Sequence, residues 1–140
     1  MDAVRVQHYI DRARDFFKGM QLVRDDVLYQ NTAALLAIHS AISYSDALRT
    51  GLGDVNINAD DHNQAVKSLL YLLQQRRWND HTGFTHLQYL MSQKSAVAYS
   101  SRRLDESEVR HLTAKAERFA TWVNNIGIKL RLKGWTHDDQ

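Results

Sequence analysis

The chain has 140 residues, 44% of them hydrophobic, so a single domain over residues 1–140 with one core is expected. The absence of cysteine excludes disulfides, thiolate zinc sites and a cysteine nucleophile, and without an apolar run of membrane length or a signal-peptide pattern we expect a cytoplasmic protein with no membrane span. The net charge of +2 is too small to indicate nucleic-acid binding by itself.

The first two predicted helices differ in how many apolar faces they have. Proline, which helix interiors exclude most strongly, is absent from the whole chain, and this favours helix. Over residues 2–23, one apolar stripe repeats at helical spacing and leaves the opposite face polar. Over residues 27–52, apolar residues follow two stripes, which predicts a central helix that ends at Gly51 and Gly53.

Three further helices are predicted, and no strand or repeat pattern is present. The third includes residues 65–73, and the fourth resumes at Phe84 after the loop-like "RRWNDHTG" and fades between Lys94 and Tyr99. The fifth starts at Asp105, which with Glu108 matches a capping box. Its regular apolar seam indicates a bundle core, with a dimer seam as the alternative. The fold class is therefore an all-α, up-and-down bundle of about five helices.

The basic end of the fifth helix, "IKLRLKGWTHDDQ", offers two interpretations. We expect a fraying helix terminus. The alternative is a nucleic-acid arm, because basic residues alternate there with Trp135, whose ring could stack on a base.

Candidate site residues occur in two places. Lys94 and Tyr99 stand five residues apart at the end of the fourth helix, and Arg102 and Arg103 follow them. The second group is a polar stripe on the apolar central helix, formed by His39, Ser43 and Asp46 at helical spacing. Because a carboxylate on such a helix needs a partner, we expect Asp46 to pair with Lys94 or one of the two arginines, and His39 to be either a core histidine or part of the site.

Three segments together, "IHSAISYSDALRTGLG", "DDHNQAVKSLLYLL" and "KSAVAYSSRRLDESEVRHLTAKAERFATWV", resemble the HEPN superfamily of helical bundles over residues 30–126. The resemblance implies a homodimer and a nucleotidyltransferase as a protein partner. Because the sequence has no cysteine and no helical His-x3-His pair, we expect no structural metal, and no other cofactor is predicted. Active members are similar to metal-independent ribonucleases that carry an arginine, four to six intervening residues and a histidine in a dimer cleft.

At that motif this chain has Lys94 and Tyr99. Lysine lacks the planar fork with which arginine holds two phosphate oxygens, and a phenol with an ordinary pKa of about 10 does not accept a proton at neutral pH. The expected function is therefore a noncatalytic binding module for a nucleotide, an RNA phosphate or a nucleotidyltransferase. Its expected binding residues are Asp46, Lys94, Tyr99, Arg102 and Arg103, with His39 and Ser43 in a secondary role.

Other interpretations stay open. Arg76 and His81 also satisfy the arginine–histidine spacing and would be the catalytic pair of a metal-independent endoribonuclease. The same activity could instead use an unconventional site built from Lys94, Tyr99 and the two arginines that follow them. They stand before the fourth helix, whereas the superfamily places the pair at a helix start or end later in the chain. A dimerisation or scaffolding bundle would also fit the apolar patterns, and Lys94 and Tyr99 would then be an ordinary amphipathic helix end.

Overall fold

The computed structural model describes residues 2–55, 57, 62–99 and 101–135. Over these residues the chain is an all-α bundle of five α-helices with one short 3-10 helix and no strand, which confirms the predicted fold class. The elements are α1 (Asp2–Val23), η1 (Val27–Tyr29), α2 (Gln30–Gly51), α3 (His62–Gln75), α4 (Thr82–Tyr99) and α5 (Glu106–Lys129). Within the described part of the chain, no helix combines the length and the apolar character that a membrane span requires.

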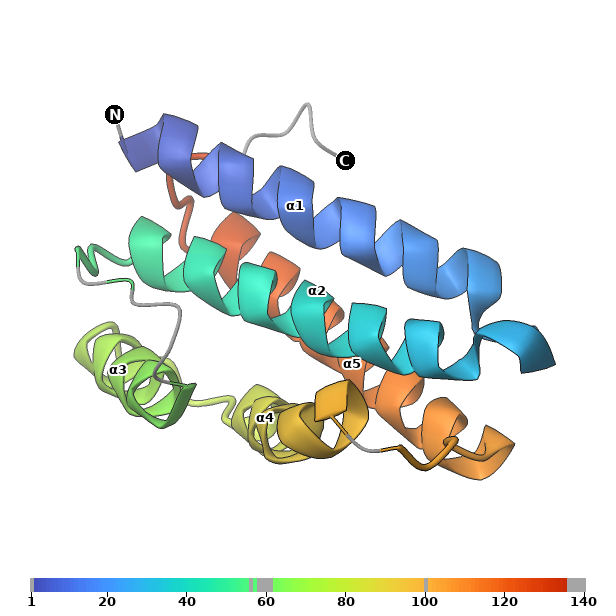
Figure 1. The fold of residues 1–140 in the computed structure, drawn as a ribbon. Helices are drawn as coiled ribbons and strands as arrows, with labels where there is room; N and C mark the ends of the chain where they lie inside the picture. The colour runs from blue at the N-terminus through green and yellow to red at the C-terminus, as the bar shows by residue number, and fades with distance from the viewer. Residues whose placement is uncertain (1, 56, 58–61, 100, 136–140) are drawn as a thin grey trace.

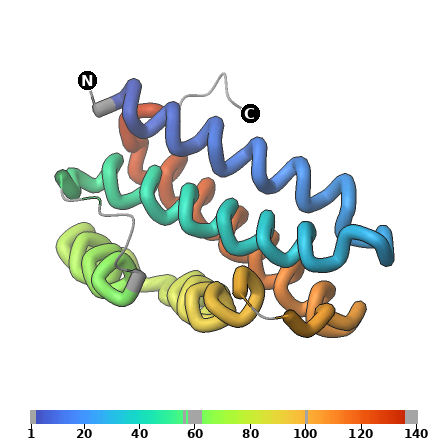
Figure 2. The backbone as a smooth tube through the Cα atoms, in the orientation of Figure 1, coloured from blue at the N-terminus to red at the C-terminus, as the bar shows by residue number. Residues whose placement is uncertain are grey.

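The helices form two sets that differ in direction. Helices α1, α2 and α5 run along the length of the molecule, while α3 and α4 are steeply inclined to them and lie below α2 in the view of Figure 1. The trace in Figure 2 shows the start of α1 and the segment after α5 at the same end of the bundle. Helix α2 contacts each of the other helices, as predicted for the central helix.

The composition of α2 explains its central position. Several of its alanines are completely buried, and their small side chains allow neighbouring helices to approach closely. These alanines are Ala33, Ala34, Ala37, Ala41 and Ala47. The helix ends as the sequence predicts, at Gly51, and Gly53 follows with a φ angle of 101° that favours glycine.

Helix α5 begins with the predicted capping box. The side chain of Asp105 accepts a hydrogen bond from the Glu108 amide at 2.8 Å, and the Glu108 carboxylate accepts one from the Asp105 amide at 3.2 Å. The apolar seam of α5 is buried inside this one chain, which confirms that it is bundle core. Its buried members are Val109, Leu112, Ala116, Phe119, Val123 and Ile126.

The prediction of a fraying basic end after α5 is wrong for residues 130–135, and its remaining part, residues 136–140, lies outside the described residues. Helix α5 ends at Lys129, and the chain then turns back so that Leu132 and Trp135 are only 6% and 8% exposed. The indole Nε1 of Trp135 donates a hydrogen bond to Oδ1 of Asn124 at 3.1 Å. The ring packs over Gly127, where a Cβ atom would lie 2.3 Å from it. Trp135 is therefore a core residue and has no open face for stacking on a base.

Candidate functional site

The end of α4 and the loop before α5 carry four of the predicted binding residues. Tyr99 is the last residue of α4 and is 85% exposed. Arg102 donates two hydrogen bonds to the carboxylate of Glu108, at 2.7 and 2.8 Å. This pairing raises the pKa of Arg102 and lowers the pKa of Glu108 to about 2. The charge of Arg102 is therefore matched by a carboxylate of its own chain.

Arg103 lies in a different environment from Arg102. Its guanidinium donates a hydrogen bond to the carbonyl oxygen of Val27 in η1, and within the described residues it forms no ion pair with a carboxylate. The next residue, Leu104, donates its amide to Oδ1 of Asn31 at 3.0 Å. These two contacts fasten the loop to the start of α2.

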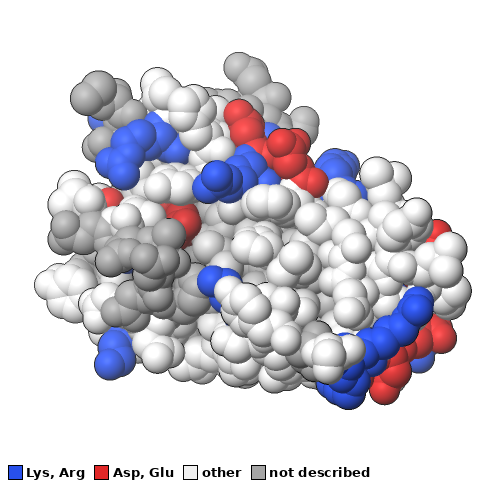
Figure 3. Space-filling model, in the orientation of Figure 1, with Lys and Arg blue, Asp and Glu red and all other residues white. Residues whose placement is uncertain are grey.

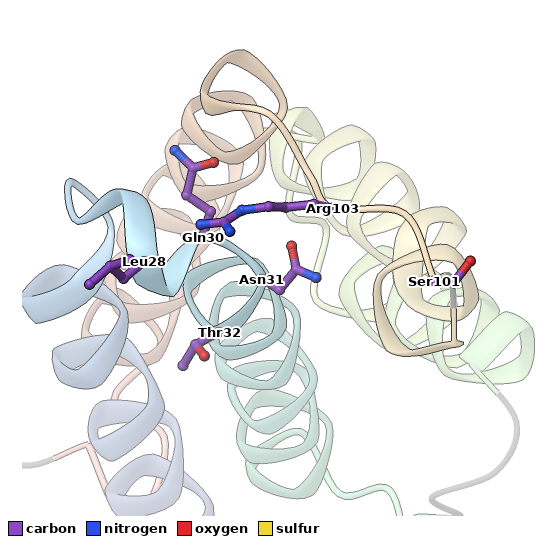
Figure 4. Close-up of a pocket in the computed structure, with 6 residues that line it drawn as sticks. All are labelled: Leu28, Gln30, Asn31, Thr32, Ser101 and Arg103. Atoms are coloured by element: carbon purple, nitrogen blue, oxygen red, sulfur yellow. The ribbon is translucent and has the colours of Figure 1, made fainter.

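A surface pocket of about 280 Å³ opens where this loop meets η1 and α2. Figure 4 shows Arg103 extending from the loop across the start of α2 toward Gln30. The pocket is lined by Leu28, Gln30, Asn31, Thr32, Ser101 and Arg103. Of these six described residues, only Arg103 carries a charge, and four of the others have polar uncharged side chains. Such a lining suits a small anion that accepts hydrogen bonds.

Asp46 lies in another part of the molecule. It is separated from Asn31 by about 22 Å along α2, at roughly 1.5 Å per residue. Its carboxylate pairs with Arg49 of the same helix at 3.7 Å. The sequence predicts that Asp46 pairs with Lys94 or one of the two arginines. The arginines are not its partners, because they are held by Glu108 and Val27 at the far end of α2, and the pair with Lys94 stays a prediction.

Asp46 belongs to a polar network around the buried Arg49. Nε and Nη2 of Arg49 lie 3.0 and 2.9 Å from Oδ2 of Asp54, and Ser68 of α3 donates its hydroxyl to the same oxygen at 2.6 Å. Burial raises the pKa of Asp46 to about 6, the charges of Arg49 and Arg12 act to lower it, and the charge of Asp54 raises it further. A carboxylate with such a raised pKa is a candidate functional group.

His39 connects the polar stripe of α2 to α1 and α4. Its half-buried ring lies 5.5 Å from the ring of Phe16. Burial lowers the pKa of His39, and the positive charges of Lys94 and Arg12 lower it further. The structure therefore brings His39 and Lys94 into one electrostatic neighbourhood. The stripe also includes Ser43, which is 3% exposed. Arg12 is a member of this neighbourhood that the sequence did not indicate.

Arg76 and His81 lie on the turn between α3 and α4, so they precede α4 in the chain, as the sequence predicts. Both are exposed. Nε2 of His81 lies 3.0 Å from the carbonyl oxygen of Trp78, and its ring packs edge-on against Phe84 with 5.7 Å between ring centres. The imidazole is thus engaged with its own turn.

Among the described residues, no group of three or more histidine, aspartate or glutamate side chains is arranged to hold a metal ion. Comparisons with protein-family models, with curated proteins and with solved structures gave no match to this chain.

Proposed function

We propose that this protein is a noncatalytic, HEPN-like binding module that takes up the phosphate of a nucleotide or of RNA beside the α4–α5 loop. The observation that carries the proposal is the pocket in which Arg103 is the one charged residue among six that line it. An arginine that already donates to a carbonyl oxygen keeps its positive charge and its other N–H donors for a phosphate.

Binding without cleavage follows from the side chains around this pocket. The six described lining residues include no imidazole and no carboxylate that could take a proton from a ribose hydroxyl. The two positions that resemble the ribonuclease motif hold Lys94 and Tyr99, so the histidine of that motif is absent there. Tyr99 instead offers an exposed ring on which a base can stack.

The proposal includes a homodimer and a nucleotidyltransferase as protein partner, as the resemblance implies. In the view of Figure 3, the surface over the first half of α2 and the adjoining part of α1 carries few charged side chains. Next to it, Val27 and Leu28 are 61% and 74% exposed. Sedimentation velocity tests the dimer, and a single monomeric species across the micromolar range would contradict it. An adjacent gene for a minimal nucleotidyltransferase would support that partner.

The neighbourhood of His39 favours a second candidate function, a metal-independent endoribonuclease. Burial and two nearby cations lower the pKa of His39, so its imidazole is neutral at pH 7 and able to accept a proton. Lys94 and Arg12 would then supply the positive charge for the scissile phosphate. This site differs from the Arg76–His81 pair, in which the histidine is engaged with its own turn.

The proposed binding is tested with a fluorescently labelled single-stranded RNA and the variant Arg103→Gln. We expect this change to weaken binding by about 10- to 100-fold, because a charge-assisted hydrogen bond contributes roughly 1.5–3 kcal/mol. Arg5→Gln is the matched control, since Arg5 is an exposed arginine on α1 and its loss changes the net charge equally. Affinity is measured by fluorescence polarisation.

Equal affinities of Arg103→Gln and Arg5→Gln would show that the pocket does not bind the phosphate. The same RNA is also incubated with the wild-type protein in the presence of a chelator. If the wild-type protein cleaves the RNA and the His39→Ala variant does not, the protein is a ribonuclease centred on His39 and the binding-module proposal is wrong. Cleavage that disappears in His81→Ala would assign the activity to Arg76 and His81.

A further inference from the structure

The outer surfaces of α4 and α5 meet along a stripe of rings and cations. Helix α4 contributes His86 and Tyr89, and α5 contributes His111, Lys115 and Arg118, which lie on one face of the helix at steps of four and three residues. The rings of Tyr89 and His111 meet edge to face with 4.8 Å between their centres. We call these five residues the α4–α5 stripe.

Among the described residues, the carboxylates of α5 are paired with arginines outside the α4–α5 stripe. Helix α4 contains no aspartate or glutamate. The three glutamates of α5 are each bound by an arginine elsewhere, in the pairs Glu106–Arg110, Glu108–Arg102 and Glu117–Arg24. Within the described part of the chain, Lys115 and Arg118 form no ion pair. The stripe therefore presents a positive potential to solvent.

The electrostatic environment of His86 on α4 includes both cations of the stripe, Lys115 and Arg118. Burial lowers the pKa of His86, and the charges of Lys115 and Arg118 lower it further, so both cations lie within electrostatic range of the imidazole. Nδ1 of His86 is buried and has no hydrogen-bond partner among the described residues. Two cations without an ion-pair partner among the described residues suit a ligand that brings negative charge.

The stripe is continuous with the loop that contains the proposed phosphate pocket. Burial raises the pKa of Tyr89, and the charge of Glu108 raises it further, so Tyr89 lies near the carboxylate that Arg102 binds. From His111 to Arg118 the stripe extends about 10 Å along α5, at roughly 1.5 Å per residue, and Glu108 lies about one helical turn before His111. A ligand that occupies both places must therefore be an extended chain.

We propose that the α4–α5 stripe binds single-stranded RNA, with phosphates on Lys115 and Arg118 and a base against the rings of Tyr89 and His111. The inference rests on the proposed function for the class of ligand and adds the path of the strand. Rings and cations that lie together along one surface match a chain that carries both bases and phosphates, since each stacked base contributes about 1–3 kcal/mol. An acidic protein segment would use the cations and leave the rings without a role.

The test compares two double variants that remove the same charge. Lys115→Gln/Arg118→Gln changes the stripe, and Arg5→Gln/Lys18→Gln changes exposed residues of α1. The probe is a labelled oligouridylate RNA of about twelve nucleotides, within the site sizes of roughly 4–16 nucleotides known for single-strand binders. We expect the stripe variant to bind the RNA at least about tenfold more weakly. The slope of log K against the logarithm of the salt concentration should become smaller by about 1.4, since each phosphate contact in a single strand contributes roughly 0.7 to that slope.

A third variant, His111→Ala, separates stacking from charge. This change removes a ring and leaves every lysine and arginine in place, so at a pH of about 8 it should weaken binding and leave the salt dependence as it is. If circular dichroism shows that the stripe double variant is not folded, the single variant Arg118→Gln takes its place, because Arg118 is exposed. For this single variant, the slope of log K against the logarithm of the salt concentration should become smaller by about 0.7.

The outcomes distinguish this inference from the proposed function. If the stripe variants bind RNA like wild type while Arg103→Gln binds weakly, the stripe does not carry the strand and the pocket still does. If the protein binds a polyglutamate peptide through Lys115 and Arg118 and does not bind RNA, the stripe is a docking surface for an acidic protein and the inference is overturned. If the α1 double variant loses as much affinity as the stripe variant, binding is nonspecific and the inference also fails.

Discussion

Asp46 is a carboxylate that the fold holds largely out of water, with 16% of its side chain exposed. Burial raises its pKa from 3.8 to about 6, against the lowering effect of Arg49 and Arg12. The folded state therefore keeps the proton of Asp46 over a pH range in which the unfolded chain has already released it. For this group, stability is greatest below its unfolded pKa and falls as the pH rises to about 6.

Replacing Asp46 with asparagine should therefore stabilise the protein at neutral pH. The expected gain in the free energy of unfolding is about 1–3 kcal/mol at pH ~7, and it should vanish below a pH of about 4, where both states carry the proton. Urea unfolding at these two pH values measures the difference. Asp15→Asn, at an exposed position of α1, is the control and should show no such dependence on pH. A loss of stability at neutral pH would mean that the pair with Arg49 outweighs the burial of Asp46.

At the scale of single residues, the sequence indicated that Asp46 needs a basic partner, and the structure supplies one in Arg49. This partner could have been found, because residues three apart share a helix face. The further contact of Arg49 with Asp54 could not have been found, since it depends on how the loop after α2 folds back. The same holds for Arg103, which binds a carbonyl oxygen 76 positions away in the chain.

At the scale of elements, the contact between α4 and α5 depends on a glycine beneath a tryptophan. A Cβ atom on Gly83 would lie 2.0 Å from the ring of Trp122. The ring has little freedom to move, because its Nε1 donates to the carbonyl oxygen of Asp80 at 3.0 Å and it packs against Phe84 and Phe119. Any side chain at position 83 must therefore push the two helices apart.

Gly83→Ala should destabilise the protein by about 1–3 kcal/mol through this overpacking, although alanine is the better helix former by roughly 1 kcal/mol. Gly19→Ala is the matched control in α1. There the added Cβ would lie 3.2 Å from Cδ1 of Leu36, the end of a flexible side chain. We expect that change to be neutral or to stabilise by up to about 1 kcal/mol. Urea unfolding of both variants tests the difference, and equal effects would contradict the role of Trp122.

The sequence assigned Gly83 to a loop because "RRWNDHTG" is rich in turn-forming residues, whereas the structure places it as the second residue of α4. Local composition was informative about the turn itself, which contains Arg77 at a φ angle of 57°. It could not show that Trp122 covers position 83, because that contact joins two helices through tertiary packing.

At the scale of the whole molecule, the helices and their order were predictable and the closure of the bundle was not. Helical periodicity is a local property, so residues 2–23 and the start of α5 could be identified from spacing and capping residues alone. The segment after α5 has no helical repeat of its own. Its position depends on residues of three helices that are far apart in sequence, Val6 of α1, Gly51 of α2 and Gly127 of α5, and no local pattern connects them.

Trp135 closes the end of the bundle where α1, α2 and α5 meet. Cβ atoms on Gly127 of α5 and Gly51 of α2 would lie 2.3 and 3.2 Å from its ring, and the neighbouring Gly134 lies against Val6 of α1. Trp135→Ala should therefore lower the free energy of unfolding by about 3–5 kcal/mol, as expected for a large buried ring. Lys133→Ala, an exposed change two residues away, should stay within about 0.5 kcal/mol. Equal unfolding free energies for the two variants would mean that this segment contributes nothing to the bundle, whereas the expected difference would show that it holds three helices together.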